Sequence, residues 1–135
     1  MSQMLKPIII LVLSSVLVLA PHLVEADTHL SVNNYLYNSL ELLLHCQSKD
    51  DDLGRHLLHP KESFKFRFNP NLWGTTLYYC SFQWPGAVKW FNIYEDGRDS
   101  SNCDDGKCIW IIKQDGPCQV NAPGYGVICY PWKGE

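Results

Sequence analysis

Cysteine is the residue type in this 135-residue chain whose number and spacing most constrain the chemistry. Thiols pair as disulfides in an oxidising compartment, whereas cysteines of a cytosolic protein stay reduced or bind zinc. Zinc ligands occur as C-x-x-C pairs or alternate with histidines at fixed spacings, and the sequence has neither pattern. We therefore expect three disulfides and no metal. The six residues are Cys46, Cys80, Cys103, Cys108, Cys118 and Cys129.

The first 26 residues indicate which compartment the chain enters. Lys6 supplies positive charge, residues 7–20 form an apolar run, and Val24-Glu25-Ala26 offers a small-residue cleavage site. The run ends at Pro21 and is too short for a membrane anchor. We predict a secretory signal peptide over residues 1–26, a processed chain that begins at Asp27, and an extracellular protein whose thiols are oxidised.

Three consecutive aspartates, Asp50, Asp51 and Asp52, could attract calcium, because hard cations prefer clustered carboxylates. A calcium loop of the EF-hand type needs glycine at its sixth position and glutamate at its twelfth. The sequence from Asp50 onward does not meet that register. A solvated turn, with charges that a partner could contact, is the preferred interpretation.

Hydrolytic chemistry would need a histidine beside a nucleophile or a second acid or base. His56 and His59 flank two leucines in an expected strand, which places them on opposite faces, and His45 lies on a separate segment. The sequence also lacks the G-x-S-x-G elbow of serine hydrolases. We predict that the protein is not an enzyme and uses no cofactor.

Tryptophan rings could stack on sugars. Most aromatic side chains of so small a domain should fill its core, so the loop residue Trp73, between Pro70 and Gly74, is the one to test first. We expect it to pack as a plug over the edge of the fold. The five tryptophans are Trp73, Trp84, Trp90, Trp110 and Trp132.

Size and charge limit the classes of partner. Without its leader the chain has 135 − 26 = 109 residues, enough for one domain over residues 27–135. The leader removes Lys6 and Glu25, which leaves 11 − 1 = 10 basic and 14 − 1 = 13 acidic residues and a net charge of −3. Nucleic acid and anionic membranes select clustered Lys and Arg, so neither is expected as a partner. We expect a monomer.

Short stretches of aromatic and β-branched residues, separated by turn signals, predict strands rather than helices. In residues 63–68, for example, Phe64, Phe66 and Phe68 share one face. The polar segment 96–107 is expected to be an exposed loop. The fold class is all-β: a small, disulfide-linked antiparallel β-sandwich of immunoglobulin-like architecture. Strands are expected at 29–33, 39–47, 55–58, 63–68, 75–84, 88–95, 108–113, 118–120 and 127–130.

Several strings together resemble the plant self-incompatibility S-protein homologue family. They are HCQSKDDDLG (45–54), SFKFRFNPNLWGTTLYYCSFQWPG (63–86), WFNIYEDGRD (90–99), CIWIIKQDGPC (108–118) and CYPW (129–132). The resemblance implies a small secreted plant protein with a sandwich of about eight strands, hydrophilic loops and no enzymatic activity. Poppy members made by the stigma are extracellular ligands in pollen recognition. For this chain the family implies extracellular signalling more firmly than pollen rejection.

The resemblance also bears on the disulfides. Many family members rely on four cysteines, which match Cys46, Cys80, Cys103 and Cys108, and a subset adds a pair that matches Cys118 and Cys129. We expect Cys118 to pair with Cys129, because the segment between them is short and contains Pro123 and Gly124. The other four cysteines allow three pairings, which the sequence does not rank.

The hypothesis from the sequence is a secreted, non-enzymatic ligand in plant cell–cell signalling or recognition, such as self-incompatibility. Its loops 49–54 and 96–107 would contact a cell-surface receptor. The alternative is a cell-wall carbohydrate-binding module that uses exposed Trp or Tyr. The residues expected to bind a partner are Asp50, Asp51, Asp52, Arg98, Asp99, Asp104 and Asp105.

Overall fold

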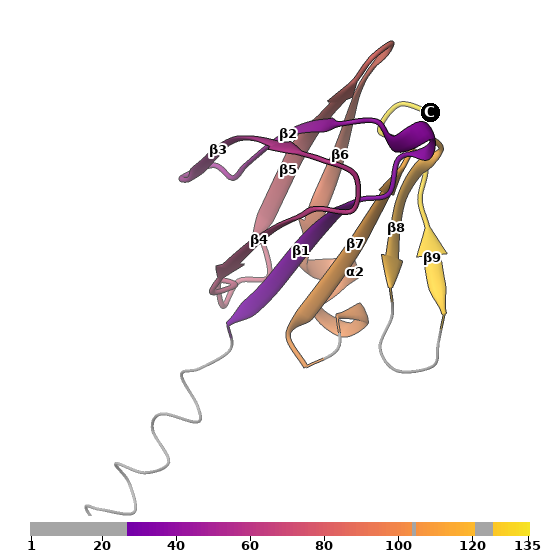
Figure 1. The fold of residues 1–135 in the computed structure, drawn as a ribbon. Coiled ribbons are helices and arrows are strands. Elements are labelled where there is room, and N and C mark those ends of the chain that lie inside the picture. Colours follow the sequence, from indigo (N-terminus) through magenta and orange to yellow (C-terminus); the bar gives the residue numbers. More distant parts are fainter. Residues whose placement is uncertain (1–26, 104, 121–125) are drawn as a thin grey trace, which may run out of the picture.

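Two β-sheets face each other in the computed structural model, which describes residues 27–103, 105–120 and 126–135 (Figure 1). The predicted leader, Asp104, Pro123 and Gly124 lie outside the described residues. The strands are β1 (Thr28–Asn34), β2 (Leu42–Gln47), β3 (Asp52–Leu58), β4 (Ser63–Phe68), β5 (Leu77–Trp84), β6 (Ala87–Glu95), β7 (Lys107–Lys113), β8 (Gly116–Val120) and β9 (Val127–Cys129).

The strand order confirms the all-β sandwich and corrects one detail of it. One sheet has the order β4-β1-β7-β8-β9 and the other the order β3-β2-β5-β6. All strand pairs of the described residues are antiparallel except β1 and β7, which run parallel. After β1 the chain forms β2 and β3 of the second sheet, adds β4 to one side of β1, and completes the second sheet with β5 and β6. It then returns as β7 on the other side of β1, and this long crossover allows the parallel pairing.

Alternation of apolar and polar side chains explains why these segments form strands. In β2, Leu42, Leu44 and Cys46 are buried, while Leu43 and His45 lie on the other face. In β4, Phe68 is buried, and Phe64 and Phe66 pack partly against the core. The expected inward faces of both strands are therefore confirmed.

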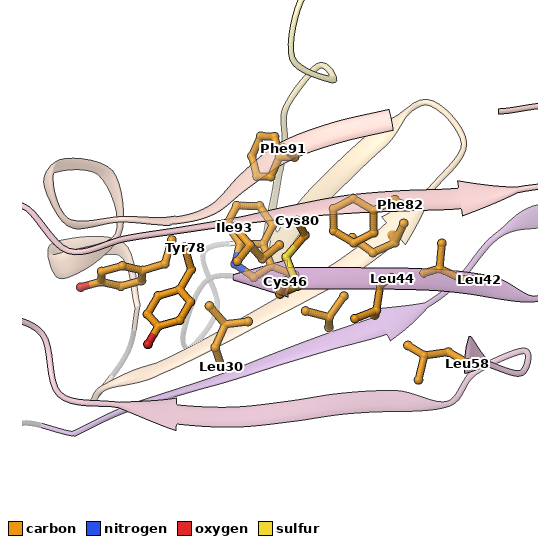
Figure 2. Close-up of a cluster of buried hydrophobic side chains, with 14 of the residues drawn as sticks. Leu30, Leu42, Leu44, Cys46, Leu58, Tyr78, Cys80, Phe82, Phe91 and Ile93 are labelled. Carbon is orange, nitrogen blue, oxygen red and sulfur yellow. A yellow bond between two sulfur atoms is a disulfide. The ribbon is translucent and has the colours of Figure 1, made fainter. Parts of the chain in front are cut away.

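The core lies between the two sheets (Figure 2). Cys46 and Cys80 stand directly opposite each other on β2 and β5, and their disulfide points into this core. Trp132, after β9, closes the core from the C-terminal end of the chain: its ring packs on Phe82 and Trp84, and it is 2% exposed. Its indole N–H donates to the carbonyl of Gln114 over 2.8 Å.

Two short helices interrupt the strands, η1 (Tyr37–Ser39) and α2 (Asp96–Asn102). Neither helix of the described residues is long or apolar enough to cross a membrane. The helix α2 corrects the expectation that segment 96–107 is an exposed loop. Its first turn is stabilised because the buried carboxylate of Asp99 accepts a hydrogen bond from the backbone amide of Glu95.

Candidate functional site

Three connections meet at one end of the sandwich, which we call the loop end. It consists of the β2–β3 turn (residues 48–51), the β4–β5 loop (residues 69–76), and α2 with the residues that lead into β7. One cleft lies between the β2–β3 turn and the β4–β5 loop, and a second is lined by Pro70 together with residues of α2. The predicted partner-binding residues that the structure describes lie in or next to these segments, but their surroundings differ.

The β2–β3 turn exposes two of the three aspartates. The turn is closed by the amide of Ser48, which donates to the carbonyl of Asp51 (2.7 Å), and by the amide of Asp51, which donates to the Ser48 hydroxyl (3.1 Å). Asp50 and Asp51 are exposed and form no ion pair with the described residues. Their charges are therefore available to a partner.

Asp52 differs from its two neighbours, because it is the first residue of β3 and not part of the turn. Its Oδ1 accepts from the amide of Gly54 (2.9 Å) and lies 2.6 Å from Nε2 of His45. The Gly54 amide, and then His45, hold the pKa of Asp52 below its ordinary value. The assignment of Asp52 to a loop was wrong, since it begins β3, although its side chain is still 62% exposed.

The β4–β5 loop is shaped by one side chain. Oδ1 of Asn71 accepts hydrogen bonds from the amides of Trp73 and Thr75, each 3.1 Å long. Nδ2 of Asn71 donates a hydrogen bond of 3.0 Å to the Thr75 hydroxyl. This arrangement points the tip of the loop into solvent: Leu72 is 101% exposed and Trp73 is 86% exposed. The expectation that Trp73 plugs the edge of the fold was wrong, because the Asn71 turn directs it away from the core.

The cleft between the turn and the loop measures about 690 Å³. Tyr78, which is buried, lines it. Burial raises the pKa of Tyr78, a hydrogen bond with Ser48 opposes the rise, and the charges of Asp51 and Asp50 add to it. The wall of the cleft is polar and consists of Ser48, Lys49, Asp50, Asp51, Asn69, Asn71, Thr75, Thr76 and Tyr79, with Leu77 beside them.

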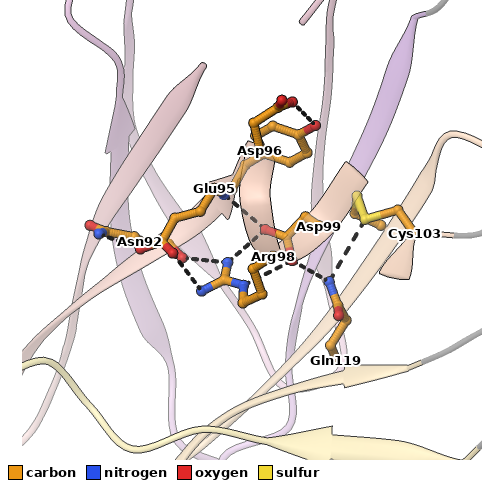
Figure 3. The surroundings of a disulfide bond; sticks show 9 residues. Asn92, Glu95, Asp96, Arg98, Asp99, Cys103 and Gln119 are labelled. Atoms are coloured by element: carbon orange, nitrogen blue, oxygen red, sulfur yellow. Dashed lines mark hydrogen bonds and ion pairs between the residues drawn. A yellow bond between two sulfur atoms is a disulfide. The ribbon is translucent and has the colours of Figure 1, made fainter. Parts of the chain in front are cut away.

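The predicted residues of α2 are turned inward. Asp99 has no exposed surface, and its carboxylate accepts from the amide of Glu95 (2.9 Å) and from the Nε2 amide of Gln119 (3.0 Å) (Figure 3). Arg98 donates to the same carboxylate from Nε (2.8 Å) and Nη2 (2.7 Å). The expectation that Asp99 contacts a partner was wrong, because its carboxylate is buried and accepts its hydrogen bonds from groups within the fold.

The side chain of Arg98 is also mostly buried. Its guanidinium lies 4.9 Å from the ring centre of Phe91, 5.0 Å from that of Trp110 and 5.3 Å from that of Tyr130. Such contacts favour a cation over aromatic faces. With 16% of its side chain exposed, Arg98 is a structural cation and not the exposed charge that the sequence predicted.

Disulfides lie next to two segments of the loop end, the β2–β3 turn and α2. The structure joins Cys46 to Cys80, Cys103 to Cys108, and Cys118 to Cys129. The last is the pair expected from the sequence, and the first two are one of the three pairings left open. Cys103 follows α2 directly, so its bond to Cys108 anchors that helix to β7. Of the remaining predicted residues, Asp105 is exposed and Asp104 lies outside the described residues.

The three histidines considered for catalysis do not converge. His45 bonds Asp52, His59 lies 3.4 Å from a carboxylate oxygen of Glu41, and the ring of His56 stacks on Phe64 with centres 4.1 Å apart. Within the residues that the structure describes, no three His, Cys, Asp or Glu side chains gather as a bound metal ion would require.

Comparisons with known proteins place this geometry in a family. The family model described as "Plant self-incompatibility protein S1" matches residues 29–132. S-protein homolog 5 of Arabidopsis thaliana is 50% identical over 92 residues, which cover 68% of each chain. The chain belongs to this family. S-protein homolog 2 of the same plant is 48% identical over 105 residues, which cover 75% of this chain and 65% of that protein. This S1-family protein therefore spans about two thirds of the length of these two relatives.

A solved structure supports the fold of this S1-family protein. It aligns with a TM-score of 0.57 at 18% identity, and the alignment covers 78% of this chain and 94% of the solved one. The solved protein is a self-incompatibility protein homologue, from what is described as a widespread family of small, highly stable, secreted proteins from plants. The extracellular location expected from the sequence agrees with that description.

One functional candidate of this S1-family protein escaped the sequence analysis. Leu72 is fully exposed next to Trp73, and the two together form an apolar tip. The signal was present in the string Asn71-Leu72-Trp73-Gly74, where two large apolar residues stand between residues that favour a tight turn. Apolar side chains at the tip of so short a turn have nothing to pack against, so an exposed pair could have been expected.

Proposed function

We propose that this S-protein homologue is a secreted, non-enzymatic ligand that binds a plant cell-surface partner through its loop end and acts as a monomer in cell–cell recognition. The observation that carries the proposal is the exposed pair Leu72 and Trp73 at the tip of the β4–β5 loop, whose neighbouring residues line one cleft with Asp50 and Asp51. Tryptophan is enriched among residues that dominate binding energy, and charges around such an anchor speed the encounter with a partner. Rejection of self pollen is one form of such recognition.

The rigidity of the loop end supports the proposal. The side chain of Asn71 fixes the backbone on which Trp73 stands, and Ser48 fixes the turn that carries Asp50 and Asp51. A partner that binds surfaces already in place loses less conformational entropy, which favours affinity. Exposed loops on a disulfide-linked sheet suit recognition for this reason.

A binding experiment on wall-less plant cells tests the proposal. The processed chain, residues 27–135, would carry a fluorophore and be titrated onto protoplasts, with unlabelled protein as competitor. We expect saturable binding that Trp73→Ala weakens about 30-fold, as for a central anchor. The matched control is Trp90→Ala, which removes a half-exposed tryptophan from the outer face of the four-stranded sheet. This variant should bind like the wild type.

The acidic turn has its own control. Asp50→Asn and Asp51→Asn should each weaken binding a few-fold, mainly through a slower on-rate, because exposed charges steer association. Asp115→Asn removes another exposed carboxylate, between β7 and β8 and outside the loop end, and should have no effect. Equal binding by the Trp73, Asp50 and Asp51 variants and the wild type would contradict the proposal.

A second candidate function, binding of neutral cell-wall glycans, has one specific observation in its favour. The loop that carries the exposed Trp73 also lines a cleft with hydroxyl and amide groups, and such groups together can bind sugar rings and their hydroxyls. A glycan array separates the two functions. A carbohydrate-binding module would retain neutral glycans and lose them with Trp73→Ala, whereas a ligand for a protein receptor would retain none.

A further inference from the structure

The outer face of the larger sheet carries a cluster of positive charge that the order of residues in the sequence conceals. Arg67 on β4 and Lys107 on β7 both pair directly with His29 on β1, so the three side chains form one row across the sheet. Lys65 stands in the next row, opposite Ser31. All four nitrogen-bearing side chains are exposed. We call this surface the basic face; its three strands lie side by side in Figure 1.

No acidic group of the sheet balances this charge. The outward positions of β4, β1 and β7 hold no Asp or Glu, and none of Lys65, Arg67 and Lys107 forms an ion pair with the described residues. Asp27 and Asp105, the acidic residues closest to the row along the described chain, precede β1 and β7. The protein as a whole has a net charge of −3, so the basic face is opposite in sign to the whole molecule.

The arrangement works against stability. Arg67 and Lys107 lie on either side of β1, two strand spacings or about 9.6 Å apart, and like charges at that separation repel. A groove of about 500 Å³ runs over the same residues, with Ser31 and Ile109 beside the cations. Charge repulsion concentrated in a groove indicates a surface shaped for an anionic occupant.

Three cations spread over two strands and two rows favour a polymer over a single ion. We infer that the basic face binds a linear acidic polysaccharide of the extracellular matrix, a chain of uronic acids whose carboxylates meet Arg67, Lys107 and Lys65. The Ser31 hydroxyl and the apolar surface of Ile109 would contact the sugar hydroxyls and ring faces. Binding there would retain the secreted protein near the cell that releases it.

Other polyanions fit the surroundings less well. Anionic lipid is concentrated on the cytoplasmic side of the plasma membrane, which a secreted protein does not meet. The face also lacks the protruding apolar side chains with which peripheral proteins enter a bilayer, Ile109 being 40% exposed. Acidic peptides carry the same charge on a different backbone and are included in the test as a competing ligand.

The test uses polygalacturonate as the probe, and its methyl ester as the matched neutral polymer. The processed protein should bind the acid form, with affinity that falls as salt rises, and should not bind the ester. The variant Lys65→Gln/Arg67→Gln/Lys107→Gln should bind about tenfold more weakly or worse. The control variant Lys49→Gln/Arg55→Gln/Lys133→Gln has the same net charge, removes three exposed cations elsewhere, and should bind like the wild type.

Several outcomes would overturn the inference. Equal losses in the two triple variants would show attraction by net charge alone. Equal binding to the ester, tighter binding to polyglutamate, or binding only to phosphatidylserine vesicles would each exclude the acidic polysaccharide. A melting temperature of the basic-face variant at or above that of the wild type is also expected, since it loses repulsion. A large drop in that temperature would assign the three cations a structural role and contradict the inference.

Discussion

The β2–β3 turn and the segment from Asp96 to Cys108 are alike in sequence and opposite in structure. Both are polar, both are rich in aspartate, and each lies next to a disulfide. In the turn, Asp50 and Asp51 remain exposed, whereas α2 buries Asp99 and holds it with Arg98. The difference shows that acidic residues near each other in a secreted protein can serve recognition or folding, depending on whether a cation lies within reach of a buried position.

The largest effect should come from breaking the buried side of this comparison. Asp99→Ala would leave the mostly buried guanidinium of Arg98 without its carboxylate and the Glu95 amide without its acceptor. We expect a loss of about 3 kcal/mol in the free energy of unfolding, because the mostly buried cation loses its nearest carboxylate and keeps only a 4.0 Å contact with Glu95. Denaturant unfolding measures it.

The matched control for Asp99 lies in the turn. Asp51→Ala removes an exposed carboxylate that pairs with no described residue, and its free energy of unfolding should stay within about 0.5 kcal/mol of the wild type. If the two variants lost equal stability, the distinction between a structural and an available aspartate would be wrong.

The Cys103–Cys108 disulfide offers a second way to disturb α2 alone. The two cysteines are 5 residues apart, so the chain-entropy model assigns the bond about 2 kcal/mol. The double substitution Cys103→Ala/Cys108→Ala should lower stability by that amount and speed hydrogen exchange at the end of α2. Exchange in the β2–β3 turn should not change. A uniform increase across both regions would mean that the disulfide supports the whole fold and not this helix.

A smaller change tests whether the two regions depend on each other. Gly74, in the β4–β5 loop, has φ +72°, and an added Cβ would lie 3.2 Å from Oδ2 of Asp96 in α2. Gly74→Ala should cost about 1–2 kcal/mol, from backbone strain and from pressure on Asp96, which accepts from the Tyr94 hydroxyl. Gly86→Ala, at φ +90° in open space, has the strain alone and should cost less. Equal costs would show that the loop and α2 are independent.

Much of the fold could be predicted because its signals are local. The alternation in residues 63–68 gave the bounds of β4, and all the other expected strands are present with shifted ends. The parallel pairing of β1 with β7 could not be predicted, since it depends on how distant segments meet and not on the pattern within either strand.

The site was harder to predict than the fold, for a related reason. Whether Asp99 is buried depends on Gln119, twenty positions away, and whether Lys65, Arg67 and Lys107 share a face depends on strand register. Neither the burial of Asp99 nor the shared face of the three cations can be inferred from the residues next to them in the sequence. Asp50 and Asp51 were placed well because a run of charge beside a glycine rarely does anything but turn through solvent.

The smallest effect should appear beside the turn, at Asp52, the first residue of β3, which has partners within the chain. The pKa of Asp52 lies below its ordinary value of 3.8, so ionised Asp52 favours the folded state. That contribution is fully present above pH 3.8 and is lost as the pH falls through the lower, folded-state pKa. Asp52→Asn should therefore melt slightly below the wild type at about pH 6, and the two melting temperatures should converge in strong acid. A gap that stays constant down to about pH 2 would mean that the interaction with Gly54 and His45 does not depend on charge, and Asp52 would then resemble Asp51 more closely than its contacts indicate.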